Sequence, residues 1–82
     1  IHLTKTLSTK WAKKGVRVNS ISPAGIERDQ SLHFKQKLSD LIPIGRMMYI
    51  EELIGPSLFL TSDLSTYVIG QNMLVDGGRS VW

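Results

Sequence analysis

The 82-residue chain contains no cysteine. This absence excludes a disulfide-stabilised scaffold and a thiol nucleophile, and it fits a reducing compartment, so we expect a cytoplasmic protein. Long apolar runs are also missing: none approaches the roughly 18 residues that span a bilayer, and no signal-peptide pattern is present. We therefore expect no membrane partner.

Recognisable reaction centres are missing as well. The seven glycines match neither GxGxxG nor the P-loop pattern, no GxSxG nucleophile elbow occurs, and the two histidines have no metal-binding spacing. A lysine one helical turn after a tyrosine would lower the tyrosine pKa. Leu53 holds that position after Tyr49, and Gln71 holds it after Tyr67. We assign no catalytic and no metal-binding residue.

The charge is moderately basic, with a formal net charge of +3 and a pI near 9.5. Much of the excess lies near the start of the chain, at Lys5, Lys10, Lys13, Lys14 and Arg17. Such a cluster could face phosphates, but aromatic and basic residues do not interleave and helix-turn-helix spacing is absent. A solvated helix face with cations near its C-terminus explains the pattern better, so we expect no nucleic-acid partner.

The chain is short for an independent domain, since a chain of this size buries only about 60 to 65% of its unfolded surface. It opens on Ile1 rather than methionine, and its first residues already have a helical pattern. We expect the front of a longer protein to be missing.

The first predicted helix covers residues 1–14. Leu3, Leu7 and Trp11 recur at helical spacing and form one apolar stripe. Gly15 follows where a left-handed C-terminal cap is expected, so the helix should end there.

Two short apolar runs, 16–21 and 72–75, read as buried strands. Pro23 should end the first, because proline cannot donate to a strand ladder. About fifty residues of mainly helical pattern separate the strands, so the connection is a crossover and the pair is parallel. The fold class is therefore α/β, with the order helix, strand, helix, helix, strand and with the last two strands adjacent.

Two helices are predicted between the strands. The first starts near residue 31, with Asp29 or Ser31 as its N-cap. The second starts at Glu51 and Glu52 and runs to residue 61, and Pro56 either lies in its first turn or marks a bend. Its inward face is predicted to comprise Leu53, Ile54, Ser57, Leu58 and Thr61. Arg46 is expected to pair with one of the two glutamates.

The loop 22–26 leaves the carboxyl end of the first strand. Ligands of open α/β sheets bind outside that edge, so this loop is the position where geometry favours function. An ordinary strand-to-helix turn explains the loop equally well.

Six segments together resemble the C-terminal third of the classical short-chain dehydrogenase/reductase family. They are RVNSISP at 17–23, GRM at 45–47, EEL at 51–53, FLTSD at 59–63, YVIGQ at 67–71 and VDGG at 75–78. The resemblance covers nearly the whole chain. It implies that residues 1–82 are the C-terminal portion of a single NAD(P)-binding Rossmann domain with a doubly wound parallel sheet. The glycine-rich cofactor loop and the catalytic Ser, Tyr and Lys would lie upstream of Ile1.

By this resemblance, the loop after the first strand holds the nicotinamide end of NAD or NADP. The implied cofactor-binding residues are Pro23, Ala24, Ile26 and Arg28, with the backbone of Ile26 meeting the carboxamide. Two of them depart from the family pattern, which has Gly at Ala24 and Thr at Arg28. An arginine offers a planar cation for a diphosphate or an acidic substrate. A surface role for Arg28 is an equal alternative.

The resemblance further implies hydride transfer between a nicotinamide and a small-molecule carbonyl or alcohol, with residues 29–41 as a flap over the substrate. It also implies a homo-oligomer, usually a homotetramer, built from the first helix and the last strand with its tail. Trp11, Val81 and Trp82 are its candidate anchors. The alternative is a non-catalytic remnant or binding module, inactive as an isolated chain.

Overall fold

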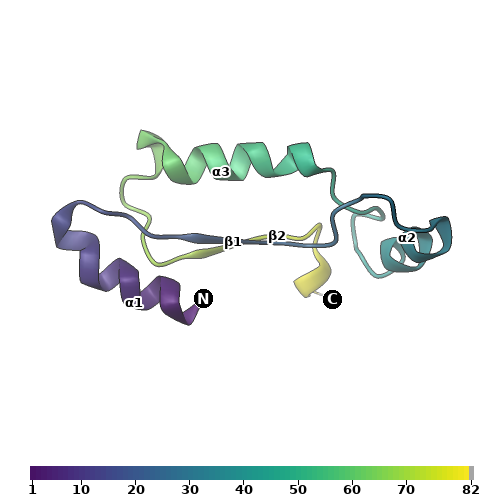
Figure 1. The fold of residues 1–82 in the computed structure, drawn as a ribbon, viewed down its shortest axis with the longest axis horizontal. Helices are drawn as coiled ribbons and strands as arrows, with labels where there is room; N and C mark the ends of the chain where they lie inside the picture. The colour runs from purple at the N-terminus through teal and green to yellow at the C-terminus, as the bar shows by residue number, and fades with distance from the viewer. Residues whose placement is uncertain (82) are drawn as a thin grey trace.

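The computed structural model describes residues 1–81. Two parallel strands lie side by side, with a helix on each face and a third helix beyond their carboxyl ends (Figure 1). The elements in order are α1 (His2–Trp11), β1 (Ser20–Pro23), α2 (Leu32–Ser39), α3 (Ile54–Thr61) and β2 (Asn72–Val75). The predicted order and the parallel, adjacent pairing are confirmed.

The bounds of the first strand were predicted wrongly. β1 starts at Ser20 and ends at Pro23, which pairs with Val75. The strand has these bounds because β2 pairs with these four residues. The N–H of Ser20 donates to the carbonyl of Gln71, just before β2, at 2.9 Å, and the N–H of Ala24 donates to the carbonyl of Val75 at 3.0 Å. Alternate residues of a strand point their N–H groups the other way, so the missing N–H of Pro23 leaves no gap in this ladder.

Side chains just before β1 tie the sheet to the end of α3. Arg17 donates four hydrogen bonds of 2.9 to 3.1 Å to the backbone oxygens of Leu60, Ser62 and Ser65 and to the hydroxyl of Ser65. Carbonyl groups at a helix end lack partners within the helix, and a cation also suits the negative end of the helix dipole. Arg17 therefore caps α3 from a distant part of the sequence.

Asn19 extends the strand pairing upstream of β1. Its Nδ2 donates to the carbonyl of Val68 at 2.9 Å, and its Oδ1 accepts from the N–H of Gln71 at 3.0 Å. The N–H of Gly70 adds a bond to Val18. Hydrogen bonds from the Asn19 side chain thus take the place of backbone pairing just before β2 begins.

A short 3-10 turn over Ala12–Lys14 follows α1 directly and completes the predicted helix. This turn ends as predicted at Gly15, whose φ of 78° lies in the left-handed region. The predicted apolar stripe is only partly buried: Leu3 is 66% exposed, whereas Ser8 is buried. A side chain on Gly70 would meet the Ser8 hydroxyl, so a small residue on each element permits the close contact of α1 with the chain entering β2.

The inward face of α3 was predicted wrongly except at Leu53, which directly precedes the helix and is half-buried. Ile54 and Leu58 are 57% and 62% exposed. Within the helix, Pro56 and Leu60 are the half-buried positions. Pro56 lies in the first turn of the helix, where its missing N–H costs no intrahelical bond. The helix is apolar on several sides, so hydrophobic spacing alone does not select the face that packs.

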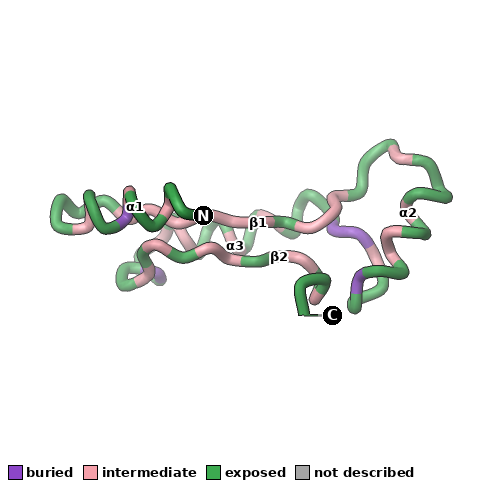
Figure 2. Tube along the Cα trace, turned by 90° about the horizontal axis from the view of Figure 1, so that it is seen from below, coloured by how far each residue is buried: buried purple, intermediate pink, exposed green. Residues whose placement is uncertain are grey.

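The described chain is elongated, with extents of 49 × 22 × 20 Å and a radius of gyration of 15.3 Å. A compact chain of this length would have a radius near 12 Å. Buried hydrophobic residues are Ile42, Met47 and Met48, and most of the trace is partly or fully exposed (Figure 2). Within residues 1–81, no helix combines the length and apolar character that crossing a bilayer requires.

Candidate functional site

Three segments converge at the carboxyl ends of β1 and β2. The loop leaving β1 pairs with the segment before α3 through a parallel bridge between Ile26 and Met48. The turn after β2 joins them, because the N–H of Ile44 donates to the carbonyl of Gly77 at 3.0 Å. This edge is where ligands of open α/β sheets bind, and the predicted cofactor loop lies on it.

The pairing with Met48 determines which way the peptide groups of Ile26 point. Met48 donates its N–H to the carbonyl of Gly25 at 3.0 Å and accepts from the N–H of Glu27 at 2.8 Å. The N–H and C=O of the intervening residue, Ile26, consequently face away from Met48. Gln30 bonds the C=O, at 3.0 Å, while the N–H of Ile26 has no partner within residues 1–81.

α2 packs closely against this loop. A Cβ on Gly25 would lie 2.5 Å from a methyl of Leu38, so the glycine lets the helix approach. Lys35 on the helix and Glu27 on the loop are 3.8 Å apart. Ser31 caps the helix, accepting from the N–H of Phe34 at 3.2 Å, which settles the choice between the two predicted caps.

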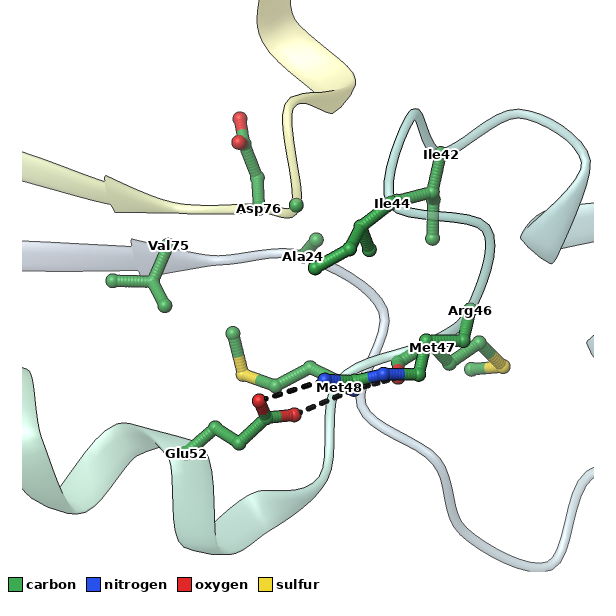
Figure 3. A pocket seen from close by; sticks show the side chains of 10 residues that line it. Ala24, Ile42, Ile44, Arg46, Met47, Met48, Glu52, Val75 and Asp76 are labelled. Atoms are coloured by element: carbon green, nitrogen blue, oxygen red, sulfur yellow. Dashed lines mark hydrogen bonds and ion pairs between the residues drawn. The ribbon is translucent and has the colours of Figure 1, made fainter.

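A cavity of about 200 Å³ opens at the same edge (Figure 3). Its walls come from the three converging segments and the start of α3: Ala24, Ile42, Ile44, Arg46, Met47, Met48, Glu52, Val75, Asp76 and Gly77. Small-molecule pockets usually measure roughly 300 to 1,000 Å³, so this cavity suits one part of a ligand. The lining is mainly apolar and carries three charged side chains, those of Arg46, Glu52 and Asp76.

Two of the charged side chains in the cavity wall form an ion pair. Arg46 donates to both carboxylate oxygens of Glu52, at 2.7 and 3.0 Å, as the dashed lines in Figure 3 show. The guanidinium also lies over the Tyr49 ring, 4.6 Å from its centre, and the N–H of Tyr49 donates to Glu52 at 2.9 Å. The predicted pairing of Arg46 with a glutamate is confirmed. Hydrogen bonds from Arg46 and then from Tyr49 lower the pKa of Glu52 to about 2.

This pair makes the geometry of the site sensitive to acid. A carboxyl whose pKa falls on folding stabilises the folded state above its ordinary pKa of 4.5, and that contribution disappears as the pH falls through about 2. In the complete protein carrying this segment, we expect Glu52→Gln to lose stability relative to wild type at pH 7. The difference should shrink between pH 4.5 and 2. Unfolding midpoints measured across that range test this, and a constant difference contradicts it. Glu51→Gln is the matched control.

Asp76 organises the turn that closes the cavity. Its carboxylate accepts from the N–H groups of Gly78 and Ser80, at 3.0 and 3.2 Å. Hydrogen bonding from Ser80, and then from Gly78, lowers its pKa. The carboxylate points away from the Arg46 and Glu52 pair (Figure 3), so it fixes backbone rather than facing a ligand.

The predicted cofactor residues lie along one loop but in different surroundings. Ala24 lines the cavity, Pro23 is exposed at the end of β1, Ile26 is half-buried, and Arg28 is exposed. Gln30 was missed, because a polar residue before a helix usually reads as part of an ordinary turn. The signal that could have found it is its position four residues after Ile26, within reach of that carbonyl.

Comparison with known proteins identifies the family. A family model described as enoyl-(acyl carrier protein) reductase matches residues 1–80. A short-chain dehydrogenase from Leptospira borgpetersenii, solved with bound NAD+, is 49% identical, with a TM-score of 0.93. That match covers 96% of this chain and 31% of the other. The chain belongs to the short-chain dehydrogenase/reductase family. Its Rossmann-like α/β fold is thereby confirmed.

Other short-chain dehydrogenase/reductase relatives bear sugar and polyol names. Sorbose reductase of Candida albicans is 47% identical over 94% of this chain and 29% of its own length. Galactitol 2-dehydrogenase of Cereibacter sphaeroides is 35% identical over 98% and 34%. A structure from Agrobacterium tumefaciens, provisionally a 2-deoxy-D-gluconate 3-dehydrogenase with bound NADP, has a TM-score of 0.90 at 34% identity, covering 99% and 35%. The chain thus spans about a third of the length of the relatives it matches.

Proposed function

We propose that residues 1–82 form the C-terminal third of an NAD(P)-dependent short-chain oxidoreductase, as one portion of a single Rossmann domain. The six motifs support this placement, because they follow the order and spacing of the family's last two strands. The elongated shape and the small buried core support it too, since a larger sheet would cover the exposed faces of α3 and β2.

The observation that carries the proposal is the unpartnered N–H of Ile26 at the carboxyl edge of the sheet. Within residues 1–81 this donor faces away from Met48 and is free to bond a ligand carbonyl. The nicotinamide of NAD or NADP carries such a carbonyl in its carboxamide. Pro23 and Ala24 would border that end of the cofactor, and the exposed guanidinium of Arg28 would meet its diphosphate. The cofactor supplies the hydride acceptor or donor when bound.

The substrate class we propose is a polyol or the corresponding ketose. Sorbose, galactitol and D-arabinitol appear in the names of the relatives. Residues 29–41, including α2, would cover this substrate, because α2 sits directly against the cofactor loop. No complete reaction centre is assembled by the described residues, so we expect the isolated 82-residue chain to be inactive.

We also propose a cytoplasmic homo-oligomer, built through α1 and through β2 with its tail. Val81 is 82% exposed and Trp11 is half-buried, so both have surface to offer a second copy. Trp82 lies outside the described residues.

The test uses the complete protein that carries this segment. NADH or NADPH should bind with micromolar affinity, seen as a change in nicotinamide fluorescence, and a polyol panel should support reduction of NAD+ or NADP+. The chain of residues 1–82 alone serves as the inactive comparison. A complete protein that binds neither cofactor would overturn the proposal in favour of the non-catalytic remnant or binding module.

A further inference from the structure

Gln30 lies between the cofactor loop and the cap of α2, and its side chain bonds only backbone. Its Nε2 donates to the carbonyl of Ile26 at 3.0 Å, and its Oε1 accepts from the N–H of Arg28 at 2.7 Å. One half-buried amide thus fastens two peptide groups of the loop at once. The two bonds require one donor and one acceptor at the end of the side chain. Among uncharged side chains, only the glutamine amide provides both at this distance from the backbone.

The peptide groups of Ile26 are consequently held from two sides. Met48 bonds the flanking carbonyl of Gly25 and the flanking N–H of Glu27, at 3.0 and 2.8 Å. Gln30 holds the carbonyl of Ile26 on the opposite side. The Ile26 N–H shares a planar peptide group with the Gly25 carbonyl, which Met48 bonds, and the bond from Gln30 fixes the next peptide group, which carries the Ile26 carbonyl.

We propose that Gln30 is a positioning residue for the cofactor: together with Met48, its amide holds the loop from Ile26 to Arg28 so that the Ile26 N–H stays aimed at the ligand carbonyl before the ligand arrives. This inference rests on the proposed function. A loop held in its binding geometry loses less conformational freedom when the ligand binds, so its affinity is higher. Without the brace, Met48 alone restrains the two peptide groups that flank Ile26, and the loop from Ile26 to Arg28 departs from its binding geometry more often.

The brace also links the cofactor loop to the flap. Gln30 directly precedes Ser31, the cap of α2, and the ion pair of Lys35 with Glu27 joins the same two elements. Losing the amide therefore affects the loop first and α2 second. The effect should appear in cofactor affinity more than in overall stability.

The decisive variants are Gln30→Glu and Gln30→Met in the complete protein. Glutamate keeps an acceptor for Arg28 but turns a carboxylate oxygen toward the carbonyl of Ile26, whereas methionine is neutral, similar in size and lacks both bonds. We expect the dissociation constant for NADH or NADPH to rise about 10-fold for Gln30→Glu and about 5-fold for Gln30→Met. KM for the cofactor should rise in parallel, with kcat at saturating cofactor within about two-fold of wild type.

Gln71→Glu is the matched control, because it removes the same kind of bond, from Nε2 to the carbonyl of Ile69 at 3.2 Å, away from the loop. Its cofactor affinity should equal that of wild type. If Gln30→Glu fails to fold, Gln30→Met decides. Unchanged affinity in folded Gln30→Met, beside a wild type that binds, overturns the positioning role alone. A wild type that binds neither cofactor overturns the proposed function and this inference together.

Discussion

Replacing Arg17 by alanine is expected to lower the free energy of unfolding of the complete protein by about 3 kcal/mol, without direct loss of any group at the candidate site. The four bonds of Arg17 reach the carbonyls of Leu60, Ser62 and Ser65 and the Ser65 hydroxyl at the end of α3. The carbonyls of Ser62 and Ser65 also accept from the N–H groups of Ser65 and Val68. Replacing Arg17 removes all four of these bonds to a charged group, each of which contributes more than a neutral hydrogen bond, and takes the Arg17 donor from the half-buried Leu60. Urea denaturation followed by circular dichroism measures the change.

Two further variants separate geometry from charge. Arg17→Lys keeps the cation near the end of α3 but has one nitrogen in place of the two that Arg17 uses, so we expect it to recover about half of the loss. Arg79→Ala removes an exposed arginine side chain and should shift the midpoint very little. Equal midpoints for Arg17→Ala and Arg79→Ala would show that the cap contributes nothing.

Arg17 also illustrates where sequence reasoning stops. The local pattern gave the helices, the caps at Gly15 and Ser31, and the parallel pair, because spacing and capping chemistry act within a few residues. Arg17, in contrast, was predicted to belong to a solvated basic face. Its partners lie more than 40 residues away in the chain, and hydrophobic spacing carries no information about such contacts.

The strand bounds and the packing face of α3 failed for a related reason. The β-branched residues around Val16 favour a strand. However, the chain entering β2 first bonds this segment at Val18, and the paired strand begins at Ser20, so the position of the partner strand sets where β1 begins. On α3, apolar residues surround the axis, and the hydrogen bond from Arg17 to the carbonyl of Leu60 ties the end of the helix to the chain that enters β1. In both places tertiary contacts override local preference.

The candidate site was predicted in outline and not in detail. The rule that ligands bind at the carboxyl edge located the loop, and the family resemblance named Ile26. Neither could show that Met48 pairs with both neighbours of Ile26, because that bridge joins segments about 20 residues apart. The structure therefore shows that the Ile26 N–H points away from Met48 and has no partner within residues 1–81. The role of this single backbone donor can be tested by mutation.

Ile26→Pro removes this N–H and nothing that Met48 uses. The bonds of Met48 go to Gly25 and Glu27, and Gly25 tolerates the backbone restriction that a following proline imposes. We expect the complete protein to fold and its affinity for NADH or NADPH to fall about 30-fold, which corresponds to roughly 2 kcal/mol for a ligand carbonyl left without its donor. Fluorescence titration of the nicotinamide measures the affinity.

Ile26→Ala is the control for this backbone test, because it truncates the side chain and keeps the N–H. If the backbone donor holds the cofactor, alanine should bind nearly as tightly as isoleucine, and proline should bind far more weakly. The unfolding midpoints of the two variants must be compared first, since proline also fixes φ near −65° and could strain the bridge to Met48. Two folded variants with the same cofactor affinity would exclude the Ile26 N–H as a binding group. A side-chain contact of Ile26 would instead weaken alanine and proline alike.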